Sequence, residues 1–445
     1  MRSSQYDDYK PSGIGWIGEI PNGWEVKRLK YTVSANDNVL AEDTPPDWEI
    51  LYVDIGNVDQ VSGITRKDAM RFEDAPSRAR RLVHHGDTIV STVRTYLKAI
   101  APIENPESNL VVSTGFAVIR PRAMDSTFLA FCLRSSYFVE TVVSRSTGVS
   151  YPATNPGEIL TIQLAYPKDP IEQQEIASFL ERETSRVDLL LGKKRDLIER
   201  LKEKRSALIS RTVTCGLPPE AAGAAGMPES FRRKPSGIDW IGDIPAHWDV
   251  RKFSREVGIA EGQVNPEIEP YAKMLLIGPE HVQSGTGSLI KRETAMEQGA
   301  ESGKYYCQQG DIVYSKIRPA LRKLVIAPED CLCSADMYPL RGRSRLRNNF
   351  IFWLFLSQQF AAWSVLESDR VAMPKINRDT LNELRMPVPP IPEQDEIAKF
   401  LSAETAKLDV MTTKVETAIE RLQEYRAALI NAAVTGKIDV RKAIA

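Results

Sequence analysis

Two glycine-lysine pairs are the first features of this sequence that suggest chemistry. Gly192-Lys193 and Gly436-Lys437 resemble the end of a loop that binds nucleotide phosphates. Such a loop also needs a second glycine upstream and a Ser or Thr directly after the lysine, because backbone N–H groups hold the phosphates and the hydroxyl holds Mg²⁺. Neither pair has these residues. The sequence therefore does not predict nucleotide hydrolysis.

Two further fragments of catalytic motifs are also incomplete. Asn155-Pro156-Gly157 lacks the second proline and the aromatic residue of the Asn-Pro-Pro-aromatic loop of amino-methyltransferases. Pro46-Asp47 could open a nuclease carboxylate motif, but no acidic-x-Lys tripeptide follows at the expected distance. We therefore expect no catalytic residue in this chain and no cofactor bound by it.

Metal-binding chemistry is poorly supported as well. The five cysteines are odd in number and scattered, and none of the four histidines stands near a cysteine pair at zinc-finger spacing. We expect free thiols and no metal site. The cysteines are Cys132, Cys215, Cys307, Cys331 and Cys333.

Clusters of basic residues are the strongest candidates for a function. The formal net charge is only −1, so a nucleic-acid interface must be a local patch. In the second half Lys316, Arg318, Arg322 and Lys323 follow a Gly-Asp pair and a short hydrophobic run, and phosphate contact is the natural use of such a cluster. Arg341, Arg343, Arg345 and Arg347 alternate shortly after. An ordinary solvated surface is the alternative.

The first half has a matching cluster, in which Arg94, Tyr96 and Lys98 follow Gly86-Asp87. Repetition at matching positions favours a function over a solvated surface. Arg94 and Arg318 could instead form structural ion pairs beside the Gly-Asp turn, and the sequence leaves this alternative open.

Two polar segments, 144–151 and 367–375, offer donors for base edges, although they could be plain connecting loops. With the basic clusters they complete our set of candidate DNA-binding residues. The set is Arg94, Tyr96, Lys98, Ser146, Thr147, Tyr151, Lys316, Arg318, Arg322, Lys323, Arg370 and Lys375.

An internal repeat dominates the organisation of the chain. KPSGIGWIGEIPNGWEVKRL from Lys10 returns as KPSGIDWIGDIPAHWDVRKF from Lys234, and EQQEIASFLERETSRVD from Glu172 returns as EQDEIAKFLSAETAKLD from Glu393. The displacements are 234 − 10 = 224 and 393 − 172 = 221 positions. The chain therefore contains two tandem units. The tryptophans of the openings recur inside a near-identical segment of both units, so we assign them to the domain scaffold or to a shared protein contact and not to base stacking. They are Trp16, Trp24, Trp240 and Trp248.

Each unit reads as a mixed domain followed by a long helix. Short β-branched runs predict strands over 88–93, 110–112, 117–120 and 312–315, and aromatic-rich stretches predict one amphipathic helix over 128–143 and another over 349–365. Apolar residues then recur every seven positions, which predicts a coiled-coil seam. The seam positions are Leu180, Val187, Lys194, Leu201 and Leu208 in the first copy and Leu401, Leu408, Val415, Leu422 and Leu429 in the second.

The two long helices are expected to pack on each other in antiparallel fashion, which would place the mixed domains at opposite ends. A parallel coiled-coil homodimer is the alternative. The predicted fold class is α+β, with two repeated mixed domains separated by two long antiparallel helices. The predicted boundaries are 1–170 for the first domain, 171–212 for the first helix, 213–233 for a linker, 234–391 for the second domain, 392–436 for the second helix and 437–445 for a tail.

These patterns resemble the specificity subunits of type I restriction-modification systems. The resemblance rests on the paired openings, the Gly-Asp strands that end in Arg, the proline-rich stops and the EQxEIAxFLxxET helices, and it covers nearly the whole chain. It implies two target-recognition domains that read a bipartite, asymmetric site on double-stranded DNA. It also implies two methyltransferase subunits and motor-nuclease subunits as partners, which would carry the S-adenosylmethionine, ATP and magnesium chemistry.

A non-catalytic coiled-coil scaffold that binds only proteins is the alternative function. Salt dependence distinguishes the two, because binding to duplex DNA weakens steeply with added salt. No apolar run reaches the roughly 20 residues that cross a bilayer, so we expect no membrane contact and a cytoplasmic protein.

Overall fold

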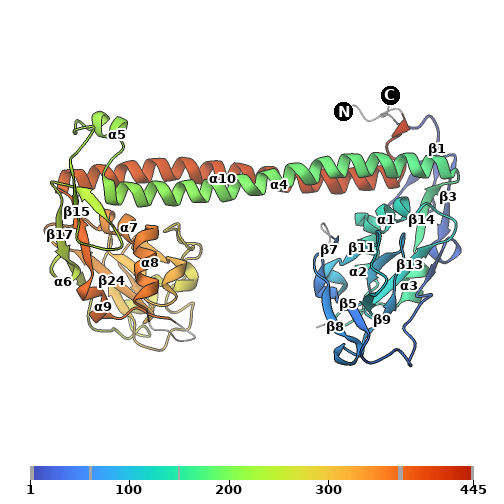
Figure 1. Cartoon of the computed structure of the whole chain (residues 1–445), viewed down its shortest axis with the longest axis horizontal. Coiled ribbons are helices and arrows are strands. Elements are labelled where there is room, and N and C mark those ends of the chain that lie inside the picture. The colour runs from blue at the N-terminus through green and yellow to red at the C-terminus, as the bar shows by residue number, and fades with distance from the viewer. Residues whose placement is uncertain (1–4, 60–62, 149–150, 369–373, 442–445) are drawn as a thin grey trace. The chain divides into compact units, whose positions relative to one another are not determined.

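The computed structural model describes residues 5–59, 63–148, 151–368 and 374–441, which fall into two compact units. Unit 1 comprises Met1–Lys194 with Thr417–Ala445, and unit 2 comprises Arg195–Glu416. Each contains one mixed domain and a part of each of the two longest helices, α4 (Pro170–Cys215) and α10 (Ile391–Val434) (Figure 1).

The domain of unit 1 is built on two four-stranded sheets. The first is antiparallel, in the order β11-β10-β13-β4, and the second has the order β8-β5-β12-β9 with one parallel pair, β5 and β12. The strands are β4 (Val33–Ala35), β5 (Glu49–Val53), β8 (Asp68–Arg71), β9 (Ala79–Leu82), β10 (Thr88–Ser91), β11 (Ile100–Pro102), β12 (Leu110–Ser113) and β13 (Phe116–Pro121). The strands predicted over 88–93, 110–112 and 117–120 are thus confirmed, except that the first ends at Ser91, two residues early.

Three two-stranded pairs complete the strands described in unit 1. They are β1 (Tyr9–Pro11) with β2 (Glu19–Pro21), β3 (Trp24–Arg28) with β14 (Gln163–Pro167), and β6 (Val58–Asp59) with β7 (Gly63–Ile64). The β3–β14 pair joins the repeated opening to the segment directly before α4, so that opening and helix are fixed to each other.

The prediction of a single amphipathic helix after the strands was wrong in both domains. Unit 1 has α1 (Ser126–Arg134) and α2 (Ser136–Ser144), and unit 2 has α7 (Asn348–Leu356) and α8 (Gln358–Leu366). Each break is at a serine with non-helical ψ, 146° at Ser135 and 153° at Ser357, whose side chain accepts a hydrogen bond from the N–H three residues on. Serine caps a new helix well, because its hydroxyl satisfies an N–H that has no partner in the first turn.

The domain of unit 2 repeats this plan. Its larger sheet has the order β18-β24-β21-β22 and its smaller one the order β19-β23-β20. The strands are β18 (Val257–Ile259), β19 (Leu276–Ile277), β20 (Tyr305–Cys307), β21 (Ile312–Ser315), β22 (Leu324–Ile326), β23 (Cys331–Cys333) and β24 (Met337–Gly342). The prediction of a strand over 312–315 is confirmed.

Outer pairs and short helices complete the elements described in the two domains. The pairs in unit 2 are β15 (Arg233–Pro235) with β16 (Asp243–Pro245) and β17 (Asp249–Lys252) with β25 (Arg385–Val388). The short helices are α3 (Pro156–Leu160) in unit 1 and α5 (Pro219–Ala224), α6 (Phe253–Glu256) and α9 (Arg378–Glu383) in unit 2. Helix α5, whose Ala222 is buried, lies within the segment that we expected to be a simple linker.

Within unit 1, α4 and α10 pack antiparallel. Ile176 and Leu180 near the start of α4 share a core with Ile430 and Val434 near the end of α10. About two turns after Leu180 in α4, Asp188 pairs with Arg426, which precedes Ile430 in α10, with a shortest N–O distance of 3.0 Å. Residues later in α4 thus contact residues earlier in α10, which is the predicted antiparallel packing.

Unit 2 shows the same packing between the other parts of the two helices. Ile209 near the end of α4 shares a core with Ile397 and Leu401 near the start of α10, and Arg205 pairs with Asp409 at 3.1 Å. Arg205 matches Arg426 in the repeat and Asp409 matches Asp188, so both units use the same ion pair. All ten predicted seam positions are buried or half-buried.

The glutamine of the EQxE motif attaches each domain to its long helix. The Gln173 side chain is buried, accepts a hydrogen bond from Asp125 N and donates one to Pro167 O, both at 2.8 Å. Gln394 makes the matching bonds with Arg347 N and Pro389 O at 2.8 Å. The helices therefore hold the loop before α1 and α7 at a fixed place.

Candidate nucleic-acid interface

The repeated tryptophans Trp24 and Trp248 are part of the scaffold. Both side chains are fully buried, and each indole N–H donates to the first glutamate of an EQxE motif at 3.0 Å, Trp24 to Glu172 and Trp248 to Glu393. Buried indoles need such a partner for the N–H. Neither ring is exposed to stack on a base.

The Gly-Asp turn of each domain holds a structural ion pair. Asp87 accepts two hydrogen bonds from Arg120, at 2.7 and 2.8 Å, and Asp311 accepts two from Arg341, at 2.6 and 2.7 Å. Both carboxylates are buried, and their hydrogen bonds raise the pKa of Arg120 and of Arg341. Paired guanidinium groups of this kind fix geometry. Arg341 is therefore held by Asp311, and its contact with DNA phosphates stays a prediction.

The ion pairs of Asp87 and Asp311 bear on the alternative that Arg94 and Arg318 form structural ion pairs beside the Gly-Asp turn. The described residues contain no ion pair to either side chain, and both side chains are exposed. The arginine that neutralises each Gly-Asp turn instead comes from β13 or β24. Sequence reasoning could not distinguish these arginines, because the partner lies 30 or more positions away.

A strained five-residue loop follows β10 and β21, and we call it the Arg loop, residues 94–98 in unit 1 and 318–322 in unit 2. A 3-10 turn in each loop stands between two left-handed residues, Arg94 (φ 51°) and Lys98 (φ 53°) or Arg318 (φ 47°) and Arg322 (φ 46°). Non-glycine residues rarely adopt positive φ, and such strain gathers at functional sites.

The same backbone bond holds both Arg loops. Arg94 N donates to Pro152 O, and Arg318 N donates to Pro374 O, both at 2.8 Å. An isolated bridge also joins Ile317 to Lys375, and another joins Thr147 to Ala153. The polar segments predicted to read base edges thus lie against the Arg loops at their described ends.

Exposed aromatic and basic side chains surround the Arg loop of unit 1. The Arg94 guanidinium lies over the Tyr151 ring, 4.8 Å from its centroid. Tyr96 and Tyr151 are 51% and 60% exposed, large values for aromatic rings, and Thr147 is exposed beside them. These residues are brought together as predicted, although their role stays a prediction.

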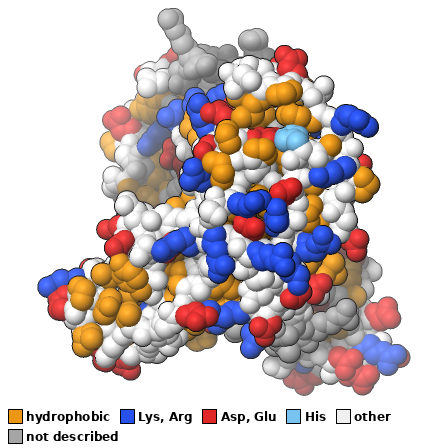
Figure 2. All heavy atoms as spheres, turned by 90° about the vertical axis from the view of Figure 1, so that its left-hand side faces the viewer, with side chains coloured by type: hydrophobic (Ala, Val, Ile, Leu, Met, Phe, Trp, Pro, Cys, Tyr) orange, Lys and Arg blue, Asp and Glu red, His pale blue; other side chains and the backbone are white. Residues whose placement is uncertain are grey.

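In unit 2 the Arg loop is joined by Lys316 and Lys375. The Lys316 ammonium lies over the Tyr338 ring at 5.2 Å, and the side chains of Arg318 and Lys375 are exposed. Figure 2 shows one face of this unit, on which Lys and Arg side chains lie among Asp and Glu side chains. Basic groups on this face are thus dispersed, in keeping with the near-zero net charge.

Several candidate residues have other partners. Lys98 forms an ion pair with Glu140 at 2.8 Å, and the Ser146 hydroxyl bonds with Thr95 and with Val142 O. Lys323 donates to Pro279 O at 2.7 Å. Arg370 lies outside the described residues. Lys98, Ser146 and Lys323 thus have contacts inside the protein.

Arg322 faces the long helix. Its guanidinium donates to Ser206 of α4 at 3.1 Å and to Leu356 O at 3.3 Å, and burial, with a smaller effect of Arg205, lowers its pKa. Arg322 therefore docks the Arg loop of unit 2 on α4.

Sequence analysis missed two kinds of exposed residue. Leu97 and Leu321 sit at matching positions of the Arg loops and are 43% and 39% exposed. Leu189 and Leu190 in α4 match Val410 and Met411 in α10, and all four are exposed although they lie on long amphipathic helices. The signal for the helix residues was their position outside the heptad seam.

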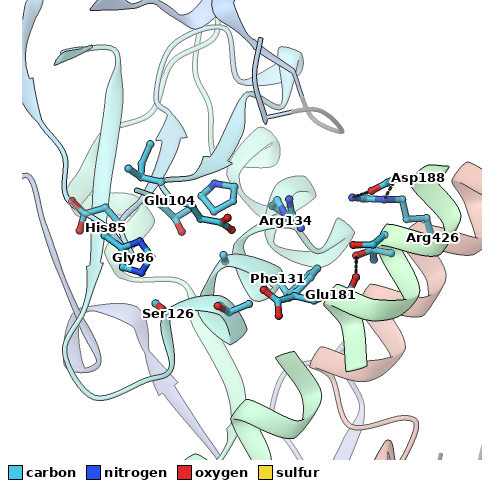
Figure 3. Close-up of a pocket in the computed structure, with 17 residues that line it drawn as sticks. His85, Gly86, Glu104, Ser126, Phe131, Arg134, Glu181, Asp188 and Arg426 are labelled. Carbon is cyan, nitrogen blue, oxygen red and sulfur yellow. Dashed lines mark hydrogen bonds and ion pairs between the residues drawn. The ribbon is translucent and has the colours of Figure 1, made fainter. Parts of the chain in front are cut away.

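A cavity of about 520 Å³ lies in unit 1 between α1, the Gly86 turn and the long helices. In Figure 3 Arg134 lies between Glu104 and the Asp188–Arg426 pair. The Arg134 Nε is buried and has no hydrogen-bond partner within the described residues, and burial and Arg426 lower the Arg134 pKa to about 10. Burial, with Glu104 and Asp125, raises the pKa of Glu181.

Unit 2 fills the corresponding space with its own residues. Phe352 stands where unit 1 has Ala130, and its ring packs against Gly287, while Arg205 donates to Gly285 O and Thr286 O. The cavity therefore reflects looser packing of the first domain on the helices, and its charged groups form no catalytic constellation.

Replacing Arg134 with leucine, the residue at the matching position 356, is expected to stabilise the protein by about 1 kcal/mol, because the change removes a desolvated guanidinium that has no ion pair within the described residues. Urea unfolding of the full chain checks this. The control Arg28→Leu changes an exposed arginine and should shift stability by less than about 0.5 kcal/mol. A loss of stability in Arg134→Leu would show that the guanidinium is compensated.

Within the described ranges, no group of three or more His, Cys, Asp or Glu side chains is arranged to hold a metal ion. None of the helices in those ranges combines the length and the apolar character that a bilayer-spanning segment needs.

The known proteins that this chain resembles are type I restriction-modification specificity proteins. Residues 266–421 match the model of the type I restriction modification DNA specificity domain. The chain is 29% identical over 326 residues to the type I restriction enzyme EcoDI specificity subunit of Escherichia coli, with 72% of each chain covered. This chain is similar to the specificity subunits of type I restriction-modification systems.

Two solved structures share this fold over nearly the whole length. A chain from a study of complex assembly and conformational transition of the type I R-M system superposes with a TM-score of 0.70 at 20% identity, covering 93% of this chain and 98% of that one. The HsdS subunit from Thermoanaerobacter tengcongensis gives 0.51 at 20% identity, covering 94% and 98%. The predicted fold class of this chain is thereby confirmed.

Proposed function

We propose that this chain is a specificity subunit that reads a bipartite, asymmetric site on double-stranded DNA, one half-site with each domain. The observation that carries the proposal is the pair of Arg loops, which have the same backbone and different side chains. The loop is Arg-Thr-Tyr-Leu-Lys in unit 1 and Arg-Pro-Ala-Leu-Arg in unit 2. Two readers of different half-sites need this combination of a common frame and variable contacts.

The shared and the variable residues have different roles in this proposal. Arg94 and Arg318 occupy the same position, are exposed and contact DNA phosphates, which carry no sequence information. Tyr96 and Tyr151 occur only in unit 1, and Lys375 only in unit 2, so they are candidates for contacts with bases. Because the half-sites differ, the whole site is asymmetric.

Methylation mapping tests this function. The chain is assembled with its methyltransferase subunits in cells, and the methylated sites are sequenced. The expected result is one motif of two different defined parts with an undefined spacer. A single continuous motif, or methylation without any motif, would contradict the proposal.

Replacing Arg318 or Lys316 with alanine is expected to weaken binding of duplex DNA and to reduce its salt slope by about one unit for each lost phosphate contact. Arg94→Ala should do the same from unit 1. Binding is measured by fluorescence anisotropy over a salt series. Arg233→Ala, an exposed arginine of β15, is the control. An unchanged slope in Arg318→Ala would place that residue in ordinary solvent.

We further propose that the helices recruit two methyltransferase subunits. The helix patch has two separate halves, Leu189 and Leu190 of α4 in unit 1 and Val410 and Met411 of α10 in unit 2, whose apolar side chains are 46–61% exposed. Exposed apolar groups on a soluble helix mark an interaction surface. Because the two halves match in the repeat, each can receive one copy of the same partner. The partners supply S-adenosylmethionine, ATP and magnesium chemistry, and motor-nuclease subunits join through the assembled complex.

Replacing Leu189 with lysine is expected to reduce the methyltransferase stoichiometry from two copies to one, and Leu189→Lys with Val410→Lys to abolish binding, because a charge in an apolar contact is strongly unfavourable. Native mass spectrometry of the purified complex counts the copies. Leu197→Lys is the control, since this exposed leucine has alanine at the matching position 418. Two copies on the double variant would exclude the helix patch as the docking surface.

A further inference from the structure

Unit 2 contains a pocket of about 510 Å³. Its lining residues have no role in the proposed reading of DNA. The pocket lies between the 236–242 turn of the repeated opening, α8 and α9. Its lining combines two indole rings, Trp240 and Trp363, with the carboxylates of Glu367, Asp379 and Glu383. Carboxylates repel DNA phosphates, so the pocket is unsuited to nucleic acid.

The aromatic wall is held in place by the core. The Trp240 and Trp363 rings lie 6.2 Å apart at 34°, and both contact the buried ring of Phe360, at 6.4 and 5.6 Å. Both tryptophans are half-buried, so that part of each side chain remains exposed. Indole faces attract cations through the ring quadrupole, and tryptophan is the strongest of the aromatic residues in this respect.

The carboxylates outnumber the basic groups at the pocket within the described residues. Glu383 is paired with Lys252 at 2.6 Å, and Arg385 also lines the pocket. Glu367 and Asp379 are exposed and form no ion pair with any residue in the described ranges. Two carboxylates and two indoles thus line the same pocket, and both kinds of group attract an organic cation.

Unit 1 shows which cation fits. The residue that matches Glu367 is Arg145, at the end of α2. Its guanidinium donates to the Thr161 hydroxyl at 2.7 Å and to Glu158 O at 3.3 Å, at the end of α3, which matches α9. Unit 1 thus places its own guanidinium where unit 2 has an open acidic pocket.

We propose that the pocket of unit 2 binds the guanidinium group of an arginine on a partner protein. A planar guanidinium stacks on indole and bonds two carboxylates at once, which an ammonium group does less well. The pocket has no copy in unit 1, where Thr141 replaces Trp363 and Arg145 replaces Glu367. The partner therefore binds once per chain, in contrast to the two copies that the helix patch receives.

The test uses the full chain labelled with 5-fluorotryptophan, whose seven tryptophans are assigned by single substitutions in ¹⁹F NMR spectra. The probe is an acetylated, amidated Gly-Arg-Gly peptide. It is expected to shift the Trp240 and Trp363 signals only. Glu367→Gln with Asp379→Asn should weaken binding at least about fivefold, since two charge contacts are lost. Glu367→Arg, which reproduces the arrangement of unit 1, should abolish binding.

The controls distinguish this site from general attraction of cations. Glu301→Gln removes an exposed carboxylate elsewhere in unit 2 and should leave the affinity unchanged. A peptide with citrulline in place of arginine should not bind. Equal binding of the citrulline peptide, equal binding by the double variant, or shifts spread over all seven tryptophans would overturn the proposal. Tighter binding of spermidine than of the arginine peptide would assign the pocket to a small polyamine instead.

Discussion

Replacing Asp311 with alanine is expected to lower the free energy of unfolding by about 2–4 kcal/mol, because a buried carboxylate with several charge-assisted hydrogen bonds is lost. The carboxylate accepts from Gln308 N at 2.8 Å and from two nitrogens of Arg341. The turn that it stabilises begins at Gly310, in a left-handed conformation (φ 87°), and leads into β21 and the Arg loop. Loss of the carboxylate therefore weakens the support of the proposed DNA-reading loop.

Urea unfolding of the full chain measures this effect, and Asp87→Ala should give a similar loss in unit 1. Arg341→Ala should cost less, since half of its side chain is exposed, and the double variant should cost less than the sum of the two because the partners are in contact. Asp239→Ala, an exposed position, is the control. If Asp311→Ala unfolds at the same urea concentration as this control, the turn does not depend on its ion pair.

Measuring duplex DNA binding by the same variants distinguishes an effect on stability from an effect on DNA binding. Under conditions in which the chain stays folded, Asp311→Ala should weaken binding through the Arg loop that follows the turn. Arg318→Ala should weaken binding without the loss of stability, because its side chain is exposed.

The features that could be predicted from the sequence are those carried by short-range patterns and by the repeat. The strand over 312–315 follows from a β-branched run bounded by polar residues. The seam of α4 and α10 follows from the seven-residue period. The recurrence of the openings required two domains of one plan, which the matching sheets of the two units show.

Features that depend on distant partners could not be predicted. The break at Ser135 depends on whether the serine hydroxyl caps a new helix or faces solvent, and the apolar pattern continues across it. Arg322 belongs to the basic cluster in the sequence but faces α4, because Ser206 lies against it in space and 116 positions away in the chain. Charge alone does not tell a docking arginine from a DNA-binding one.

Comparison of the copies was more informative than either copy alone. It showed that the two Arg loops share one position in the repeat but differ in side chains. It also showed that the position of Glu367 in unit 2 is occupied in unit 1 by a basic residue, Arg145. The exposure of Leu189 and Val410 became apparent only from the packing of the helices, since both lie in ordinary amphipathic sequence. A repeat thus provides an internal control that a single domain lacks.

Lengthening α4 and α10 together is expected to change the spacer between the half-sites and to leave the half-sites themselves unchanged. The proposal gives each domain one half-site, and the long helices are the segments that connect the domains. Four extra residues lengthen a helix by about 6 Å. At about 3.4 Å per base pair, this corresponds to roughly one to two additional base pairs of undefined sequence.

The insertions belong near Lys194 in α4 and near Val415 in α10, at the boundary between the two units. The pair Asp188–Arg426 then stays within unit 1 and the pair Arg205–Asp409 within unit 2, so the contacts inside each unit are kept. An insertion in α4 alone breaks the match between the helices and should abolish activity. Two matched insertions restore it.

The methylated sites of the assembled complex are sequenced for the wild-type chain, the single insertion and the double insertion. Four residues turn a helix by roughly 40° beyond one full turn, so the double insertion also rotates one reader relative to the other. Some loss of rate is therefore expected beside the longer spacer. An active double variant that still modifies sites with the original spacer would show that the helices do not set this distance, and the spacing would then have to come from the domains themselves.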